Sequence, residues 1–141
     1  MNEPTRTFPE LENMLKGLGC DFFYGGSQVT CDPPPDPQSH QTDFDIVVLD
    51  TNEISVSPLV QDSLPGSGFE WDAGENYEFD DAENFLSFSK AIDGVRVNII
   101  VCLNSDFYTK FHNATVLSTK LNLLEKEKRV LLFRSVLYGE Y

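Results

Sequence analysis

The chain contains 141 residues, of which 40% are hydrophobic, and it carries a formal net charge of −13. This length and composition predict one globular domain over residues 1–141 and exclude an intrinsically disordered chain. No apolar run approaches the roughly 20 residues that cross a bilayer, so we expect no membrane partner. Met1–Glu10 lacks the basic and apolar segments of a signal peptide, and the three widely spaced cysteines form no zinc motif. These features predict a cytoplasmic protein.

The charge is distributed unevenly along the chain. Residues 1–89 contain 18 acidic and two basic side chains, whereas residues 90–141 contain eight basic and five acidic ones. The acidic part repels nucleic acid, so it serves solubility, metal attraction or, as a mimic of nucleic acid, binding to a basic protein. Only the C-terminal helices offer basic side chains to a nucleic acid, although such side chains usually form a solvated face. These are Lys110, Lys120, Lys126, Lys128, Arg129 and Arg134.

The N-terminal part predicts a helix, then a short strand that leads into a glycine turn. Apolar residues recur at helical spacing in Phe8–Leu18, and a glycine ends this helix. Asp21–Tyr24 is aromatic and predicts a strand before the turn Gly25–Ser27. Four prolines within Cys31–His40 exclude a helix and a central strand, so we expect an extended surface loop there.

Two acidic residues precede the next strand. Ile46–Leu49 is apolar and β-branched, which is typical of a buried strand. Because side chains two positions apart on a strand point to the same face, Asp43 and Asp45 project together. Two neighbouring carboxylates repel each other unless a cation lies between them, and their oxygen atoms suit Mg²⁺. Asp43 and Asp45 are therefore the predicted metal ligands and catalytic residues, and the alternative is a strand-entry pair satisfied by backbone N–H groups and solvent.

The middle of the chain predicts short elements around an acidic segment. Ser55–Leu64 is an expected helix, and Phe69–Trp71 is an expected short strand. Residues 70–83 contain seven acidic and no basic side chains. Such a segment is typical of a solvated loop or an edge hairpin.

The last part predicts a hairpin and two helices. Asp93-Gly94 is a tight-turn signal that predicts pairing of Phe85–Ala91 with Val95–Leu103. Helical spacing then continues in Ser105–Leu121, with Ser105 as the N-cap, and in Glu125–Tyr138. The element order indicates an α/β (α+β) domain, in which a small mixed sheet of four to five strands is covered by helices, two of them C-terminal.

A Gly-Gly-Ser turn followed by Asp-x-Asp on a strand combines two functional patterns. Glycines let the backbone approach a ligand, and N–H groups with a serine hydroxyl bind phosphate. This order, over residues 20–101, resembles the nucleotidyltransferase fold of the polymerase-β type. The resemblance implies transfer of a nucleoside monophosphate from an NTP to an acceptor, with Asp43 and Asp45 binding Mg²⁺. It also implies that the nucleotide is bound by Gly25, Gly26, Ser27 and Asn98.

A second resemblance extends over most of the chain. It rests on Gly26–Pro34, Thr42–Asp45, Val97–Val101, Phe107–Phe111, Lys120–Lys126 and Arg129–Gly139. Together these segments resemble small proteins of tailed bacteriophages that are often described as nucleotidyltransferase-like. This resemblance implies a phage origin and the host-cell cytoplasm as the location.

The sequence departs from the nucleotidyltransferase pattern at two points. Asn98 occupies the position of the third carboxylate, and its amide oxygen can bind a metal but cannot accept a proton. The third carboxylate could instead come from Asp50, from Asp93 or from an acidic residue of the segment 70–83. The helix that follows the Gly-Ser turn in the family has little room before the prolines, so we expect it to be missing.

These departures leave more than one function open. The first is a phage nucleotidyltransferase, with an incomplete carboxylate triad. The alternative is an inactive acidic protein that binds a host protein, and a third hypothesis is a component of the virion.

Overall fold

The structure is a computed structural model that describes residues 7–17, 19–32, 43–49, 70–71, 84–92 and 94–139. Three expectations fall wholly or mostly outside these residues: the helix in Ser55–Leu64, most of the proline loop and most of the acidic segment 70–83.

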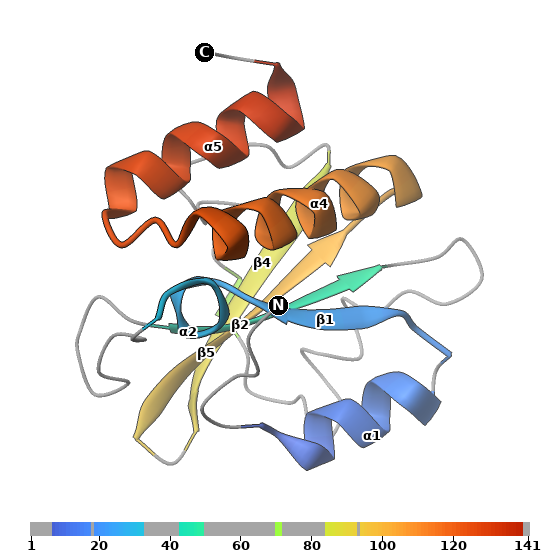
Figure 1. Ribbon diagram of the computed structural model, residues 1–141. Helices are drawn as coiled ribbons and strands as arrows, with labels where there is room; N and C mark the ends of the chain where they lie inside the picture. The colour runs from blue at the N-terminus through green and yellow to red at the C-terminus, as the bar shows by residue number, and fades with distance from the viewer. Residues whose placement is uncertain are drawn as a thin grey trace.

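Five strands and the described helices form a layered α/β domain (Figure 1). In chain order the elements are α1 (Pro9–Gly17), β1 (Phe22–Gly25), α2 (Ser27–Thr30), β2 (Asp43–Leu49), β3 (Glu70–Trp71), β4 (Phe85–Ile92), β5 (Val95–Cys102), α4 (Ser105–Leu121) and α5 (Lys126–Tyr138). The strands form one mixed sheet in the order β1-β2-β5-β4-β3. Only β2 and β5 pair in parallel among these neighbours, and the other pairs are antiparallel. This arrangement confirms the predicted mixed sheet covered by helices.

The hairpin between β4 and β5 is confirmed, and β5 is a central strand. Ile92 pairs with Val95, which leaves a loop of two residues. Gly94 in this loop has a φ of 82°, a conformation that glycine adopts without strain.

The two faces of the sheet carry separate apolar clusters. One cluster contains alternate residues of β2, which are Phe44, Ile46 and Val48, and they pack with α1. Three valines and one isoleucine of β5 belong to the same cluster. Val47 of β2 and Ile100 of β5 point to the opposite face and pack with α4 and α5. Figure 1 shows α1 on one side of the sheet and α4 with α5 on the other. Asp45 shares its face with Val47, so it lies on the α4 side.

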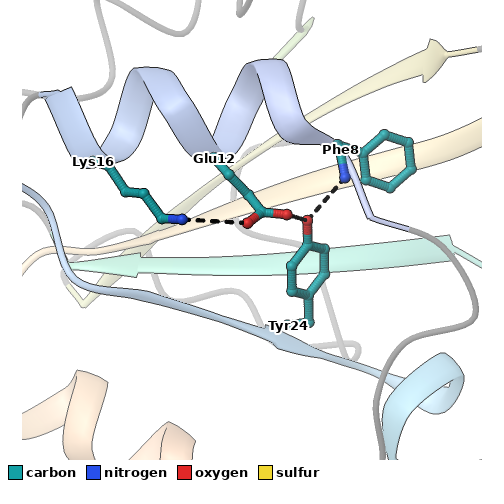
Figure 2. A network of polar contacts seen from close by, with 4 residues as sticks. All are labelled: Phe8, Glu12, Lys16 and Tyr24. Atoms are coloured by element: carbon teal, nitrogen blue, oxygen red, sulfur yellow. Dashed lines mark hydrogen bonds and ion pairs between the residues drawn. The ribbon is translucent and has the colours of Figure 1, made fainter.

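A half-buried tyrosine connects α1 to β1 (Figure 2). The Tyr24 hydroxyl donates a hydrogen bond of 2.7 Å to the Glu12 carboxylate and accepts one of 3.0 Å from the Phe8 N–H. Burial and the hydrogen bond to Glu12 raise the pKa of Tyr24 well above its ordinary value. This network orients the strand that leads into the glycine turn.

The start of α4 differs from the prediction by one residue. Asn104, not Ser105, is the N-cap, because the Asn104 side-chain oxygen accepts a hydrogen bond of 2.8 Å from the Phe107 N–H. Both residue types are good N-caps. The extended backbone of Asn104 gives its side chain this role.

Candidate functional site

Three residues from different strands lie in one row across the sheet. Gly25 of β1 is the register partner of Asp45 on β2, and Asp45 is the register partner of Asn98 on β5. Partners in register point to the same face, so Asp45 and Asn98 lie together on the α4 side. Asn98 lies on β5, as predicted for the strand Val95–Leu103, and β5 is the neighbour of β2 in the sheet.

Asp45 and Asn98 contact each other in a buried environment. The Asn98 Nδ2 donates a hydrogen bond of 3.2 Å to Asp45 Oδ1. Their exposed fractions are only 7% and 2%. Asp43 is the first residue of β2, two positions before Asp45 and in register with Arg96, and its side chain lies outside the described part of the structure.

A short helix follows the glycine turn, contrary to the expectation that it would be missing. α2 begins at Ser27, directly after Gly26, and ends at Thr30. The Val29 and Thr30 N–H groups both donate to the Gly26 carbonyl at 3.0 Å. The prediction was wrong because a single helical turn of four residues fits between the turn and the prolines.

Gly26 comes very close to the Asp45 carboxylate. Its φ of 73° and ψ of −176° fall in a region that is essentially restricted to glycine. A Cβ added at this position would overlap Asp45 Oδ2 and would lie 3.0 Å from the Cγ of the same residue. Any side chain at position 26 would therefore displace the carboxylate, so the turn and β2 form one unit.

The side-chain oxygen atoms of this row are of the type that a hard cation prefers as ligands. Asp45 and Asn98 are oxygen-containing side chains on neighbouring strands, whose spacing is about 4.8 Å. No group of three histidine, cysteine or acidic side chains that could hold a metal occurs among the described residues. Two of the predicted ligands, Asp45 and the Asn98 amide, therefore lie side by side, and Mg²⁺ binding by them stays a prediction.

The basic residues of α4 and α5 are partly occupied by local contacts. Lys110 lies 3.2 Å from Asp106, and Lys128 lies 3.8 Å from Glu125. Arg129 points inward and donates 2.9 Å to the Leu123 carbonyl. The contacts of the exposed Lys110 and Lys128 are typical of a solvated face, whereas the half-buried Arg129 is not part of such a face.

Sequence reasoning missed the contacts that hold the end of α2. Cys31, the C-cap of α2, is buried with an exposed fraction of 4%. Its Sγ accepts a hydrogen bond of 3.4 Å from Arg129, which lies 98 residues away. No local spacing signals a contact over such a distance.

No protein-family model, curated protein or solved structure matches this chain. Among the described residues, no helix has the length and apolar character needed to cross a membrane.

Proposed function

We propose that the chain binds a nucleoside triphosphate with Mg²⁺ and transfers its nucleoside monophosphate to an acceptor with release of pyrophosphate, as the resemblance to phage nucleotidyltransferase-like proteins implies. The observation that carries this proposal is the close approach of Gly26 to the buried Asp45 carboxylate. A phosphate bound by the backbone of this turn would lie beside Asp45 and beside an ion that Asp45 binds. Glycine allows the backbone to come close to a ligand, and successive backbone N–H groups in a turn can bind an anion such as phosphate.

Each residue has a role that follows from its place. Gly25 and Gly26 bring backbone beside the carboxylate, and the half-buried Ser27 offers its hydroxyl to a phosphate oxygen. Asp45, Asp43 and the Asn98 amide would bind the ion. When bound, Mg²⁺ supplies neutralisation of the phosphate charge.

Calorimetric titration with Mg-ATP, Mg-GTP, Mg-CTP and Mg-UTP tests this proposal. We expect binding heat with at least one nucleotide, and we expect Asp45→Asn to weaken it at least about tenfold, because a charge-assisted contact is lost. Asp106→Asn is the matched control, because it removes one negative charge from an exposed position on α4 and should leave affinity unchanged. No heat with any nucleotide, or equal affinity in Asp45→Asn, would overturn the proposal.

Restoring a third carboxylate tests the metal geometry. Asn98→Asp places a second acidic side chain in register with Asp45, so we expect lower stability without Mg²⁺ and recovery when Mg²⁺ is added. A variant whose melting temperature is insensitive to Mg²⁺ would count against a shared ion at these two positions.

The hydrogen bond from Asn98 to Asp45 favours a second candidate function. An amide here cannot accept a proton, and it already contacts the carboxylate that would bind the ion. The alternative is an inactive acidic protein that binds a basic host protein. Reversing the charges of residues 70–83 should then abolish stoichiometric capture of that protein, while Asp45→Asn leaves capture intact. Capture that survives the charge reversal would contradict this function.

A further inference from the structure

A short helix such as α2 does not form without outside contacts. It has only four residues, and its N-cap, Gly26, provides no side-chain hydrogen bond. Nucleating one helical turn is unfavourable, so tertiary contacts must hold it. The placement of Gly26 against Asp45 depends on those contacts, because the turn continues directly into α2.

The connection between α4 and α5 contacts the end of α2 through both backbone and side chains. Asn122 accepts a hydrogen bond of 2.8 Å from the Asp32 N–H and donates one of 3.0 Å to the Asp32 carbonyl. The Asn122 side chain thus pairs with Asp32 as a neighbouring strand would. Figure 1 shows this connection on the same side of the sheet as α2.

A second set of contacts lies beside the first. The Cys31 thiol donates a hydrogen bond of 3.5 Å to the Leu123 carbonyl, and Arg129 Nη1 donates to the same carbonyl at 2.9 Å and to Cys31 Sγ at 3.4 Å. Arg129 is in the first turn of α5. We call the five residues Cys31, Asp32, Asn122, Leu123 and Arg129 the α2 anchor.

Asn122 has a backbone conformation that favours this role. It is the C-cap of α4 in the left-handed conformation, with a φ of 49° and a ψ of 56°. Asparagine tolerates this conformation better than most residues, although glycine is the usual choice there. A glycine at position 122 would end α4 equally well but would lose both hydrogen bonds to Asp32. Asparagine and glycine at this position therefore differ only in the side-chain bonds to the end of α2.

We infer that Asn122 and Arg129 are positioning residues for the candidate site, because the α2 anchor fixes α2 and thereby holds Gly26 against Asp45. This inference rests on the proposed function for its ligand, but the anchoring itself can be measured without one. It assigns to Arg129, in the first turn of α5, an effect on nucleotide binding that is transmitted through α2.

Amide hydrogen exchange in the ligand-free protein tests the anchor. The N–H groups of Val29, Thr30 and Cys31 report on α2, because they donate to the Gly26 and Ser27 carbonyls. Asn122→Gly keeps the left-handed backbone and should speed their exchange by about tenfold, which corresponds to the loss of two ordinary hydrogen bonds. Asn104→Ala is the matched control, because it removes an N-cap at the other end of α4.

Arg129→Met adds an independent variant, since it keeps an unbranched apolar side chain in place of the arginine stem and removes the two donated bonds. We expect both anchor variants to speed exchange in α2 and Asn104→Ala to leave it near the wild-type rate. Exchange in the anchor variants no faster than in Asn104→Ala would overturn the anchor.

Titration with Mg-ATP then separates this inference from the proposed function. We expect Asn122→Gly to weaken Mg-ATP binding about fivefold, while Asn104→Ala leaves it unchanged. Faster exchange in α2 with unchanged Mg-ATP affinity would overturn the positioning role alone. No binding of Mg-ATP or another Mg-NTP by the wild-type chain would overturn the proposed function and the positioning role with it, and the exchange rates would still decide whether the anchor holds α2.

Discussion

Alanine substitutions at three glycines separate backbone strain from the contact between Gly26 and Asp45. An added Cβ meets nothing within 4 Å at Gly17, which is the last residue of α1. Gly19 has a φ of +74° and also has open space around an added Cβ. Gly26 combines a φ of +73° with overlap of the Asp45 carboxylate. Gly19 thus adds a positive φ to the open surroundings of Gly17, and Gly26 adds a glycine-only backbone conformation and the overlap with Asp45.

The expected free energies of unfolding follow from these differences. Gly17→Ala should stabilise the chain by about 0.5 kcal/mol, because alanine has less conformational freedom to lose. Gly19→Ala should destabilise it by about 1 kcal/mol through its positive φ. Gly26→Ala should destabilise it by about 4 kcal/mol, since a glycine-only conformation costs about 1–3 kcal/mol and displacement of a buried group adds about 1–3 kcal/mol.

Urea titrations followed by circular dichroism measure all three variants under the same conditions. A double-mutant cycle with Asp45→Ala isolates the contact, because truncation of the carboxylate removes the overlap; we expect a coupling of about 2 kcal/mol. If Gly26→Ala destabilises the chain no more than Gly19→Ala does, then Gly26 does not press against Asp45 and the basis of the site is wrong.

Three further predictions concern the core and the helix ends. Tyr24→Phe removes the hydroxyl bonds to α1, one of them to a carboxylate, and should lower the free energy of unfolding by about 2 kcal/mol in urea titrations; an unchanged value would contradict the network of Figure 2. Burial raises the pKa of Cys102 from 9.0 to about 12, so the folded chain binds this proton more tightly than the unfolded chain does. The contribution of this thiol to the free energy of unfolding should be fully present below pH 9 and should fall between pH 9 and 12 by up to about 1.4 kcal/mol per pH unit. The free energy of unfolding of Cys102→Ala should therefore fall less steeply from pH 8 to pH 10 than that of the wild-type chain. Equal slopes would refute this cause. Asn104→Ala should cost about 1 kcal/mol of stability while Ser105→Ala changes it by less than about 0.5 kcal/mol, and the reverse order would restore Ser105 as the N-cap.

The elements with strong local signals were predictable from the sequence. The hairpin β4–β5 follows from Asp93-Gly94, and α1 follows from its apolar spacing. The choice between Asn104 and Ser105 as N-cap was not predictable, because adjacent residues of similar capping preference give the same pattern. Helix α2 was missed for a different reason: one turn has too few residues for periodicity, and its support comes from residues about 90 positions away.

Local sequence patterns predicted the residues of the candidate site, and the pairing of the strands determines which of them meet. The sequence predicted that Asp43 and Asp45 begin a buried strand and that Asn98 lies on a later one, but parallel pairing of β2 with β5 decides that Asp45 and Asn98 are partners. Local patterns give alternation along one strand and contain nothing about the register between two strands 50 residues apart. The register is set by the apolar positions of both faces, which all move together if a strand slips.

The polar row is unusual when it is compared with its neighbours on the same strands. Along the α4 face, Asp45 is followed by Val47, and Asn98 is followed by Ile100 and Cys102, all of them buried. Apolar residues at positions 45 and 98 would continue this core, whereas a buried carboxylate and amide carry a desolvation cost. The fold also keeps a glycine-only conformation at Gly26 beside them. The buried polar pair and the strained glycine both lower stability, and they lie next to each other in space. Such departures from the most stable residues are expected where a ligand, rather than the core, determines the residue types. This local disagreement with the rules of stability supports a binding site at this end of the sheet, independently of the resemblance that suggested its chemistry.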